Sequence, residues 1–444
     1  MSEEGLLARA SNLLLDEEDT VGHRRASWLA MVVAAAGISA TPAAEEWSAS
    51  AGGWVSGDVA YVETIAEEAG GAVDAVLHDD LLYVTSFRSF SIYDVSDPGD
   101  PERLATEPVI GGLYNEQPQT NGEILLISRD VQPVPPSEHA RRGAALDIYD
   151  VSDPTSPEHL ATYHARMTGE AIPPLPFQRT ERDHLWTCVL DCTFAYSAGG
   201  TILDLSDPSA PEHVGRWTDV APHKDANSIH HVGEVAPGIV LTGGLPMYVL
   251  DASVDPADPV VLATFAPATT MADPVIEDPF TFYRGNPETL PARSSWPGGL
   301  EGRLAVVSME TPLVGNCTER AGDVQTFRAV GWGEAGEEPR FVPADRFVLD
   351  TNGTYTDGAP PHNVWGCSAY GMQVHPDFGP TGGTTAVAFF EHGIRVLDVD
   401  QHGDITERGG FVPVGGVSTA PRWLGDGYLY VTDIHRGVDI LRVA

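Results

Sequence analysis

One phrase recurs along this chain and limits what it can fold into: an apolar, strand-like run followed by Asp-Val-Ser-Asp-Pro. Complete or degenerate copies lie at residues 91–98, 147–154, 202–208, 248–251, 394–400 and 437–443. The first four runs end on marker aspartates that are 56, 54 and 47 residues apart, namely Asp94, Asp150, Asp204 and Asp251. Self-similarity at this period indicates a repeated unit of four strands with their loops, the pattern of a β-propeller blade.

The first unit shows how one blade is expected to be built. Residues 72–77, 81–85, 90–94 and 103–106 form four short runs with many β-branched and aromatic side chains. The Asp-Pro pair that follows the third run is turn chemistry, because aspartate accepts a hydrogen bond from a nearby following backbone amide and proline ends a strand. The repeat therefore predicts a turn between the third and fourth strands of each blade.

The repeats also predict a closed ring. The interval between Asp251 and Asp398 holds strand-like runs at 303–308 and 323–327, which supply a fifth blade. The last unit, 423–443, shows three strands, and residues 60–64 have the pattern of the missing outer strand. Their pairing would remove an exposed sheet edge. We therefore predict an all-β fold, a β-propeller with seven four-stranded blades closed by pairing N- and C-terminal strands.

The strand plus Asp-Val-Ser-Asp-Pro phrase resembles the LVIVD-repeat family of exported prokaryotic β-propellers. The resemblance extends over residues 55–444 and is most specific in the first three units, whereas the fifth unit departs from the pattern. It implies a fold and an export route, and it implies no particular reaction.

The N-terminal region has the three parts of a secretory signal. His23-Arg24-Arg25 precedes a mostly apolar stretch at 28–40, and small residues follow through Ala44. We predict a signal peptide with an extended n-region at 1–43, a linker at 44–54 and a single propeller domain at 55–444. The protein is then secreted, at the cell exterior or in the envelope. An uncleaved N-terminal anchor is the alternative.

The charge of the chain restricts its partners. With 64 acidic and 25 basic residues, its formal net charge is −39. Such a surface repels phosphate backbones and anionic lipid, so neither nucleic acid nor a membrane surface is an expected partner. The acids are spread along the whole chain, which favours a solubilising coat over an acidic face for cations or a basic partner. No segment after the signal is apolar enough to span a membrane, and we expect a monomer.

The four cysteines predict two disulfides in an oxidising compartment. Cys188 and Cys192 are four residues apart, where a tight hairpin turn brings two strand positions together, and Cys317 and Cys367 form a distant pair. The alternative, a zinc site, is weaker because neither pair has the spacing of a zinc knuckle.

Histidines lie at predicted blade starts and strand ends, where side chains reach the mouth of a propeller channel. They are His184, His230, His231, His362, His375, His392 and His435. His392 and His435 occupy the same place in successive blades, between the second and third strands. Several imidazoles around one axis would suit zinc, copper or iron. The alternative is that each histidine caps a turn. Calcium at the aspartate loops is less favoured, because the turns need those carboxylates.

These observations give two functional hypotheses. The first is an exported binding or scaffold propeller without catalysis or a required cofactor, which holds a protein, glycan or small ligand at one mouth. Long segments at 130–143, 163–183 and 264–300 would carry that function. The second is a metal-dependent oxidoreductase that uses the channel histidines. It would be similar to the selenium-binding protein and methanethiol oxidase propellers, whose signature cysteine and histidine motifs are not recognisable here.

Overall fold

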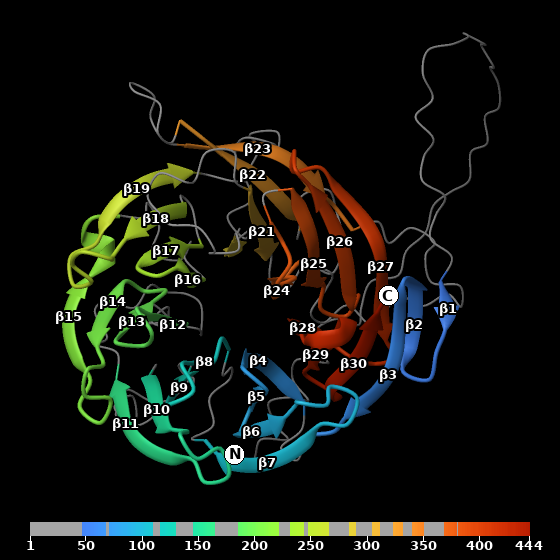
Figure 1. The fold of residues 1–444 in the computed structure, drawn as a ribbon, viewed down its shortest axis with the longest axis horizontal. Helices are drawn as coiled ribbons and strands as arrows, with labels where there is room; N and C mark the ends of the chain where they lie inside the picture. The colour runs from blue at the N-terminus through green and yellow to red at the C-terminus, as the bar shows by residue number, and fades with distance from the viewer. Residues whose placement is uncertain are drawn as a thin grey trace, which may run out of the picture. The chain divides into compact units, whose positions relative to one another are not determined.

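The structure is a computed structural model in which seven antiparallel sheets form a ring (Figure 1). It describes residues 47–67, 71–109, 116–129, 145–164, 185–221, 231–243, 247–265, 284–289, 304–310, 323–331, 340–349, 368–379 and 381–444. All of them belong to one compact unit, residues 44–444. The predicted all-β fold, a propeller with seven blades, is confirmed.

Each of the first four blades is a meander of four strands. Blade 1 comprises β4 (Ala72–His78), β5 (Leu81–Ser86), β6 (Ser89–Asp94) and β7 (Glu102–Pro108). Blade 2 comprises β8 (Gln119–Thr120), β9 (Ile124–Arg129), β10 (Ala145–Asp150) and β11 (Glu158–His164). Blade 3 comprises β12 (Trp186–Val189), β13 (Phe194–Ser197), β14 (Thr201–Asp204) and β15 (Glu212–Arg216). Blade 4 comprises β16 (Val232–Ala236), β17 (Ile239–Thr242), β18 (Met247–Asp251) and β19 (Val260–Phe265).

The last three blades follow the same order, with the N-terminal strand completing the ring. Blade 5 comprises β20 (Arg284–Thr289), β21 (Leu304–Glu310), β22 (Val324–Val330) and β23 (Arg340–Phe347). Blade 6 comprises β24 (Met372–Val374), β25 (Gly382–Ala388), β26 (Ile394–Asp400) and β27 (Ile405–Pro413). Blade 7 comprises β28 (Ser418–Trp423), β29 (Tyr428–Asp433), β30 (Gly437–Val443) and, as its outer strand, β3 (Val59–Ile65).

The repeated phrase forms the loop between the third and fourth strands. Asp94 Oδ1 accepts a hydrogen bond from the Ser96 amide at 2.9 Å, and Asp150 and Asp204 repeat this contact with Ser152 and Ser206. The residue after each marker is buried and donates its amide to the turn between the first two strands, as in Val95 N to Asp80 O at 2.8 Å. These aspartates therefore stabilise the turns of the blades, as the turn chemistry predicts.

A β-bulge in every blade confirms that the units are equivalent. The register between the third and fourth strands shifts between the residues one and two positions before the marker, for example between Ile92 and Tyr93. The same shift occurs in the other six blades. In blade 7 it lies between β30 and β3, so the N-terminal strand has the geometry of a true fourth strand.

The N-terminal segment closes the ring at two places. Ala60 pairs with Arg442 on β30, as predicted for residues 60–64. In addition, β2 (Gly53–Gly57) pairs with β27, and β1 (Ser48–Ala49) pairs with β2, which extends blade 6 to six strands. Part of the stretch expected to be a linker, 44–54, is therefore strand. The segment 47–65 spans the junction of blades 6 and 7.

Apolar side chains fill the spaces between neighbouring blades. Near the closure, Val59 packs in one cluster with Val396 of blade 6 and Leu441 of blade 7. A second cluster joins Tyr430 of blade 7 to Leu82 of blade 1. Each blade buries apolar side chains against both of its neighbours. The core therefore runs around the ring, and turns lie at its two ends.

Candidate functional site

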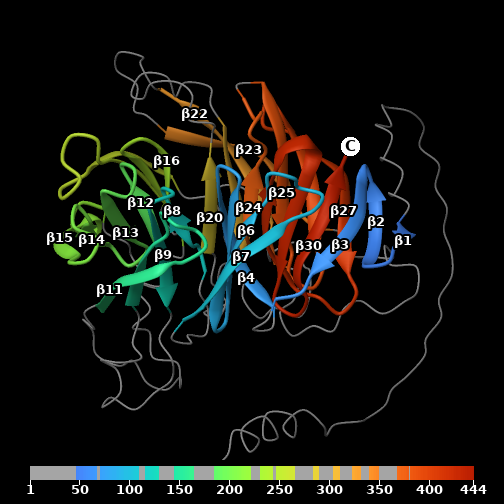
Figure 2. The same ribbon diagram turned by 60° about the horizontal axis from the view of Figure 1, so that its bottom comes forward.

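The strands run between two faces of the ring, which Figure 2 shows obliquely, turned from the view of Figure 1. On the loop face, the second strand of each blade connects to the third, and the fourth strand connects to the next blade. On the repeat face, the first strand connects to the second, and the Asp-Val-Ser-Asp-Pro loops connect the third to the fourth. These two names are kept below.

Most long connections join strand ends on the loop face. They span residues 130–144, 165–184, 222–230, 266–283, 311–322 and 350–367, which lie outside the described residues. Two further connections of this kind, 290–303 and 332–339, join strand ends of blade 5 on the repeat face. The segments 130–143 and 163–183, predicted to carry function, leave and rejoin the blades on the loop face. The third predicted segment, 264–300, contains β20. The part before β20 joins strand ends on the loop face, and the part after it joins strand ends on the repeat face.

An apolar cluster contributed by blades 1, 6 and 7 lies among the loop-face turns. Its members are Phe87, Tyr370, Phe390, Val417 and Ile434. The rings of Tyr370 and Phe390 are stacked with centroids 4.8 Å apart. Backbone hydrogen bonds brace this cluster, since Ser418 N donates to Phe390 O at 2.9 Å and Ile434 N donates to Val417 O at 3.0 Å. The loop-face turns of blades 1, 6 and 7 therefore share a small apolar cluster.

The turn between β25 and β26 holds His392 in a buried position. Phe390 adopts a φ of 47°, and Gly393 follows with a φ of 72°. A side chain at Gly393 would place Cβ 2.0 Å from the Phe411 carbonyl, so the turn requires glycine. Burial, with a smaller contribution from Arg395, lowers the pKa of His392 to about 4. The imidazole is therefore neutral at neutral pH.

Arg395 anchors this turn to the rest of blade 6 and to the N-terminal segment. Its guanidinium donates to the His392 carbonyl at 2.9 Å and pairs with Glu407 at 3.0 Å. It also lies over the Trp47 ring, 4.7 Å from the ring centre. Because Arg395 is 1% exposed, these contacts compensate a buried charge.

His435 lies in the equivalent turn of blade 7, as predicted, but it is at the surface. Its amide donates to Asp433 Oδ1 at 2.9 Å, and its Nδ1 lies 3.2 Å from the Gly415 carbonyl. Asp433 is buried, and burial together with the neighbouring Asp439 raises the pKa of Asp433 to about 6. Arg436 Nη2 donates to Asp439 Oδ1 at 2.7 Å, which offsets part of this negative charge.

His375 lies on the opposite face, directly after β24. It borders a cleft with a volume of about 320 Å³ between blades 6 and 7 on the repeat face. The imidazole packs edge-on against Trp423, with ring centres 4.9 Å apart, and its Nδ1 lies 3.8 Å from the Asp377 carboxylate. His375 therefore does not share a mouth with His392 and His435.

Of the other predicted metal ligands, the structure describes only His231. His231 precedes β16 on the loop face, where its carbonyl accepts from the Gly243 amide at 2.6 Å. His184, His230 and His362 lie outside the described residues. Within the part of the chain that the structure describes, no group of three or more histidine, cysteine, aspartate or glutamate side chains gathers in metal-binding geometry. The metal site remains a prediction.

A buried polar position that recurs in all seven blades was not identified from the sequence. It is three residues before the marker, and its occupants are Ser91, Asp147, Thr201, Tyr248, Gln325, Arg395 and Asp439. Most have charged partners, such as Glu67 for Ser91 at 2.8 Å and Arg129 for Asp147 at 3.4 Å. The sequence signal that could have revealed this position is a polar residue at a fixed distance before the marker in each apolar run. These networks fix the ends of the strands beneath the loop face.

Polar side chains also line the inner strands around the axis. Arg422 on β28 pairs with Asp74 on β4 at 2.7 Å, and the Gln117 amide donates to the same carboxylate at 2.8 Å. The Gln117 side chain donates to the Val232 carbonyl at 2.7 Å, so blade 2 is joined to blade 4. Burial raises the pKa of Asp74, and Arg422 opposes that effect. The arrangement provides hydrogen bonds across the inner ring.

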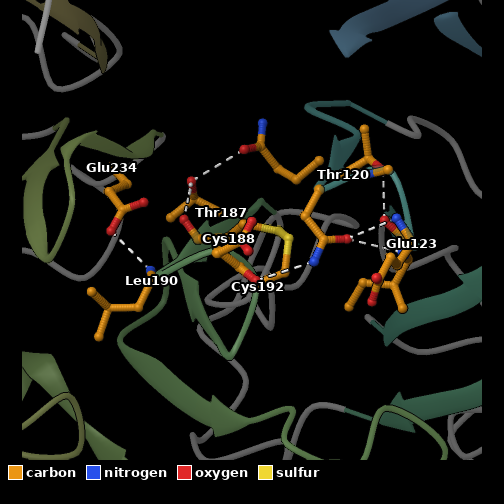
Figure 3. The surroundings of a disulfide bond; sticks show 12 residues. Thr120, Glu123, Thr187, Cys188, Leu190, Cys192 and Glu234 are labelled. Atoms are coloured by element: carbon orange, nitrogen blue, oxygen red, sulfur yellow. Dashed lines mark hydrogen bonds between the residues drawn. A yellow bond between two sulfur atoms is a disulfide. The ribbon is translucent and has the colours of Figure 1, made fainter. Parts of the chain in front are cut away.

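The predicted disulfide between Cys188 and Cys192 is confirmed, and Figure 3 shows its surroundings. It closes the turn between β12 and β13, in which Leu190, Asp191 and Cys192 all have φ values above 50°. The Leu190 amide donates to Glu234 of blade 4 at 2.9 Å (Figure 3), and Asn121 of blade 2 donates to the Asp191 carbonyl at 3.2 Å. Cys317 and Cys367 lie outside the described residues.

Comparisons with known proteins agree with this architecture. The LVIVD repeat model matches residues 140–164 and 193–219, which lie in blades 2 and 3. The β-propeller domain of Cps50 (Swd1) from Myceliophteria thermophila shares 10% sequence identity and a TM-score of 0.53. The alignment covers 87% of this chain and 100% of that one. The WD40 β-propeller domain of Doa1 is 11% identical with a TM-score of 0.49, over 87% and 97% of the two chains.

At 10% identity the likeness to the Cps50 domain concerns the fold alone. No protein with a curated description matches the sequence significantly. Among the helices that the structure describes, none has the length and apolar character to cross a membrane.

Proposed function

We propose that this seven-bladed propeller with LVIVD repeats is an exported binding or scaffold module that does not catalyse a reaction. Its ligand, a protein, glycan or small molecule, is held at the loop face. The observation that carries this proposal is the unequal use of the two faces. Six long connections outside the described residues join strand ends on the loop face and two join strand ends on the repeat face, both in blade 5. The repeat-face loops of blades 1 to 4 are short and held by their own aspartates.

The described part of the loop face supports this role. The cluster around Phe390 gives an apolar surface among the turns of blades 1, 6 and 7, and the buried pair of Arg129 and Asp147 holds the two strand ends that the connection 130–144 joins. Binding residues are commonly placed on loops that a rigid scaffold positions. The likeness of residues 140–164 and 193–219 to LVIVD repeats, together with the signal-like segment before residue 44, supports export.

A replacement of one connection tests the proposal. In the full-length protein, residues 165–184 are replaced by a short Gly/Ser linker, and residues 290–303 on the repeat face are replaced in a matched control. Labelled proteins are then screened on a glycan array and a displayed peptide library. We expect the wild type and the control to retain the same probes and the first variant to lose them. The thermal midpoints of all three proteins should be the same. A wild type that retains no probe, or probes lost only in the control, would contradict the proposal.

A metal-dependent oxidoreductase is the second candidate. It is favoured by the equivalent positions of His392 and His435 in neighbouring blades and by the neutral state of the His392 imidazole, the form that binds metals. Metal analysis of the purified protein separates the two functions. About one equivalent of copper, zinc or iron that is lost in His230→Ala or His392→Ala but kept in His375→Ala, whose histidine lies on the opposite face, would support the oxidoreductase. A metal-free, folded protein would count against it.

A further inference from the structure

The cleft between blades 6 and 7 opens on the repeat face, away from the loop-face mouth. Its lining includes His375, Asp377, Thr384, Arg408, Trp423 and Val443, and its volume of about 320 Å³ falls at the lower end of the usual range for small-molecule sites. The residues come from the turn after β24 and from β25, β27, β28 and β30. The cleft is therefore built on strands of two packed blades.

Two hydrogen-bond donors in the cleft lack partners within the described residues. The Asp377 amide donates to His375 Nδ1 at 3.2 Å, so Nδ1 is an acceptor and Nε2 is left as the donor of the ring. Arg408 uses Nε for Asp58 at 3.1 Å and Nη2 for the main-chain oxygen of Ala444, which leaves Nη1. A ligand in the cleft could therefore accept one hydrogen bond from the imidazole and one from the guanidinium.

Acceptors and an apolar surface accompany these donors. The Asp377 side chain is 94% exposed at the rim, and the Thr384 hydroxyl, which donates to Asp398 at 2.7 Å, keeps lone pairs to accept with. Trp423 and Val443 provide the apolar part. A ligand that suits this lining both donates and accepts hydrogen bonds and has an apolar face.

The charges around the cleft restrict the ligand further. Arg408 is already paired with Asp58, and Asp377 lies nearby, so an anion would meet uncompensated carboxylate in a chain of net charge −39. A cation would gain little, because the Asp377 carboxylate is 94% exposed to water, where a single carboxylate attracts an ion only weakly. We propose that this cleft binds a small neutral polyhydroxyl ligand of the size of one or two sugar rings. The site is separate from the loop face and independent of the function proposed above.

Calorimetric titration of the full-length protein tests this assignment. The probes are glucose, N-acetylglucosamine and maltose, with acetate and tetramethylammonium as charged comparisons. For ligands of about a dozen heavy atoms at modest efficiency, we expect a dissociation constant of about 1 mM for at least one sugar. Neither charged probe should bind at this site.

Matched variants locate the binding. Thr384→Val and His375→Ala should each weaken sugar binding about fivefold or more. Thr406→Val and His402→Ala, which change exposed residues of the same blade, should leave it unchanged, with thermal midpoints recorded for all four. Absence of sugar binding, preference for a charged probe, or equal effects in test and control variants would overturn the assignment. Each result is independent of whether the loop face retains its own probes.

Discussion

The Thr64 hydroxyl on β3 donates a hydrogen bond to Asp439 on β30, a contact between residues 375 positions apart. Arg436 donates to both of these side chains, to Thr64 Oγ1 at 2.9 Å and to Asp439 Oδ1 at 2.7 Å. It also donates to the Gly52 carbonyl at 2.8 Å. The ends of the chain are therefore joined by specific side-chain contacts in addition to backbone pairing, and the ring is closed where blade 7 meets the N-terminal segment.

Aspartates of the repeated phrase should make the unfolding free energy depend on pH in acid. Hydrogen bonds from Ser96, Thr155 and Ser206 lower the pKa values of Asp94, Asp153 and Asp204 below the ordinary 3.8. A lowered pKa in the folded state contributes stability above pH 3.8 that is lost as the pH falls through the folded-state pKa. We expect Asp153→Ala to be less stable than wild type at pH 6, with a difference that shrinks towards pH 2. Urea unfolding at several pH values measures this, and a constant difference would contradict it.

The buried ion pair of Arg129 and Asp147 should be sensitive to the loss of one partner. Their side chains are 2% and 4% exposed. Arg129→Met would leave the Asp147 carboxylate buried with a hydroxyl donor from Thr162 but without its counter-charge. We expect a loss of about 3–5 kcal/mol in unfolding free energy. The double variant Arg129→Met, Asp147→Leu should recover most of it, and additive losses in the double-mutant cycle would refute this explanation.

The glycine of the His392 turn should not tolerate a side chain. Gly393→Ala combines a φ of 72° with a Cβ that would lie 2.0 Å from the Phe411 carbonyl, so we expect a loss of about 3 kcal/mol. Gly233→Ala is the matched control, because a Cβ there meets nothing within 4 Å. We expect the control to lie within about 1 kcal/mol of wild type. Equal effects of the two substitutions on denaturant midpoints would show that the turn is not constrained in this way.

Removal of the disulfide should cost moderate stability. The bond between Cys188 and Cys192 closes a short loop, for which chain entropy predicts a loss of about 2 kcal/mol in Cys188→Ala, Cys192→Ala. The substitution should also increase hydrogen exchange at the Leu190 amide, whose contact with Glu234 depends on this turn. Unchanged exchange at Leu190 would indicate that the turn holds without the bond.

The repeat made much of the fold predictable. The runs expected at 72–77, 81–85, 90–94 and 103–106 correspond to β4–β7, and the runs at 303–308 and 323–327 correspond to β21 and β22. The outer strand at 60–64 was also predictable, because the last unit lacked one. Alternating apolar residues and fixed turn chemistry carry this information within each unit.

Other parts were not accessible in this way. The strands β1 and β2 form from a short, glycine-rich stretch, 48–57, whose pairing with β27 depends on backbone hydrogen bonds at an edge. Whether a histidine lies in the core or at the surface depends on packing around its turn, so the matching positions of His392 and His435 did not reveal that one is buried. His375 was expected near the axis with the other histidines. It follows the first strand of its blade, whereas His392 and His435 follow the second, and it therefore borders a cleft on the repeat face.

A cross-link between the chain ends tests ring closure most directly. Ala60 and Arg442 are exposed register partners on β3 and β30, at a separation that suits a disulfide. With Ala60→Cys and Arg442→Cys, the account predicts a disulfide between positions 60 and 442 under mild oxidation, identified by peptide mass mapping. The pair Ala60→Cys and Val260→Cys, with its second cysteine in blade 4, should not cross-link. A folded double variant that forms no bond between positions 60 and 442 would contradict the closed ring.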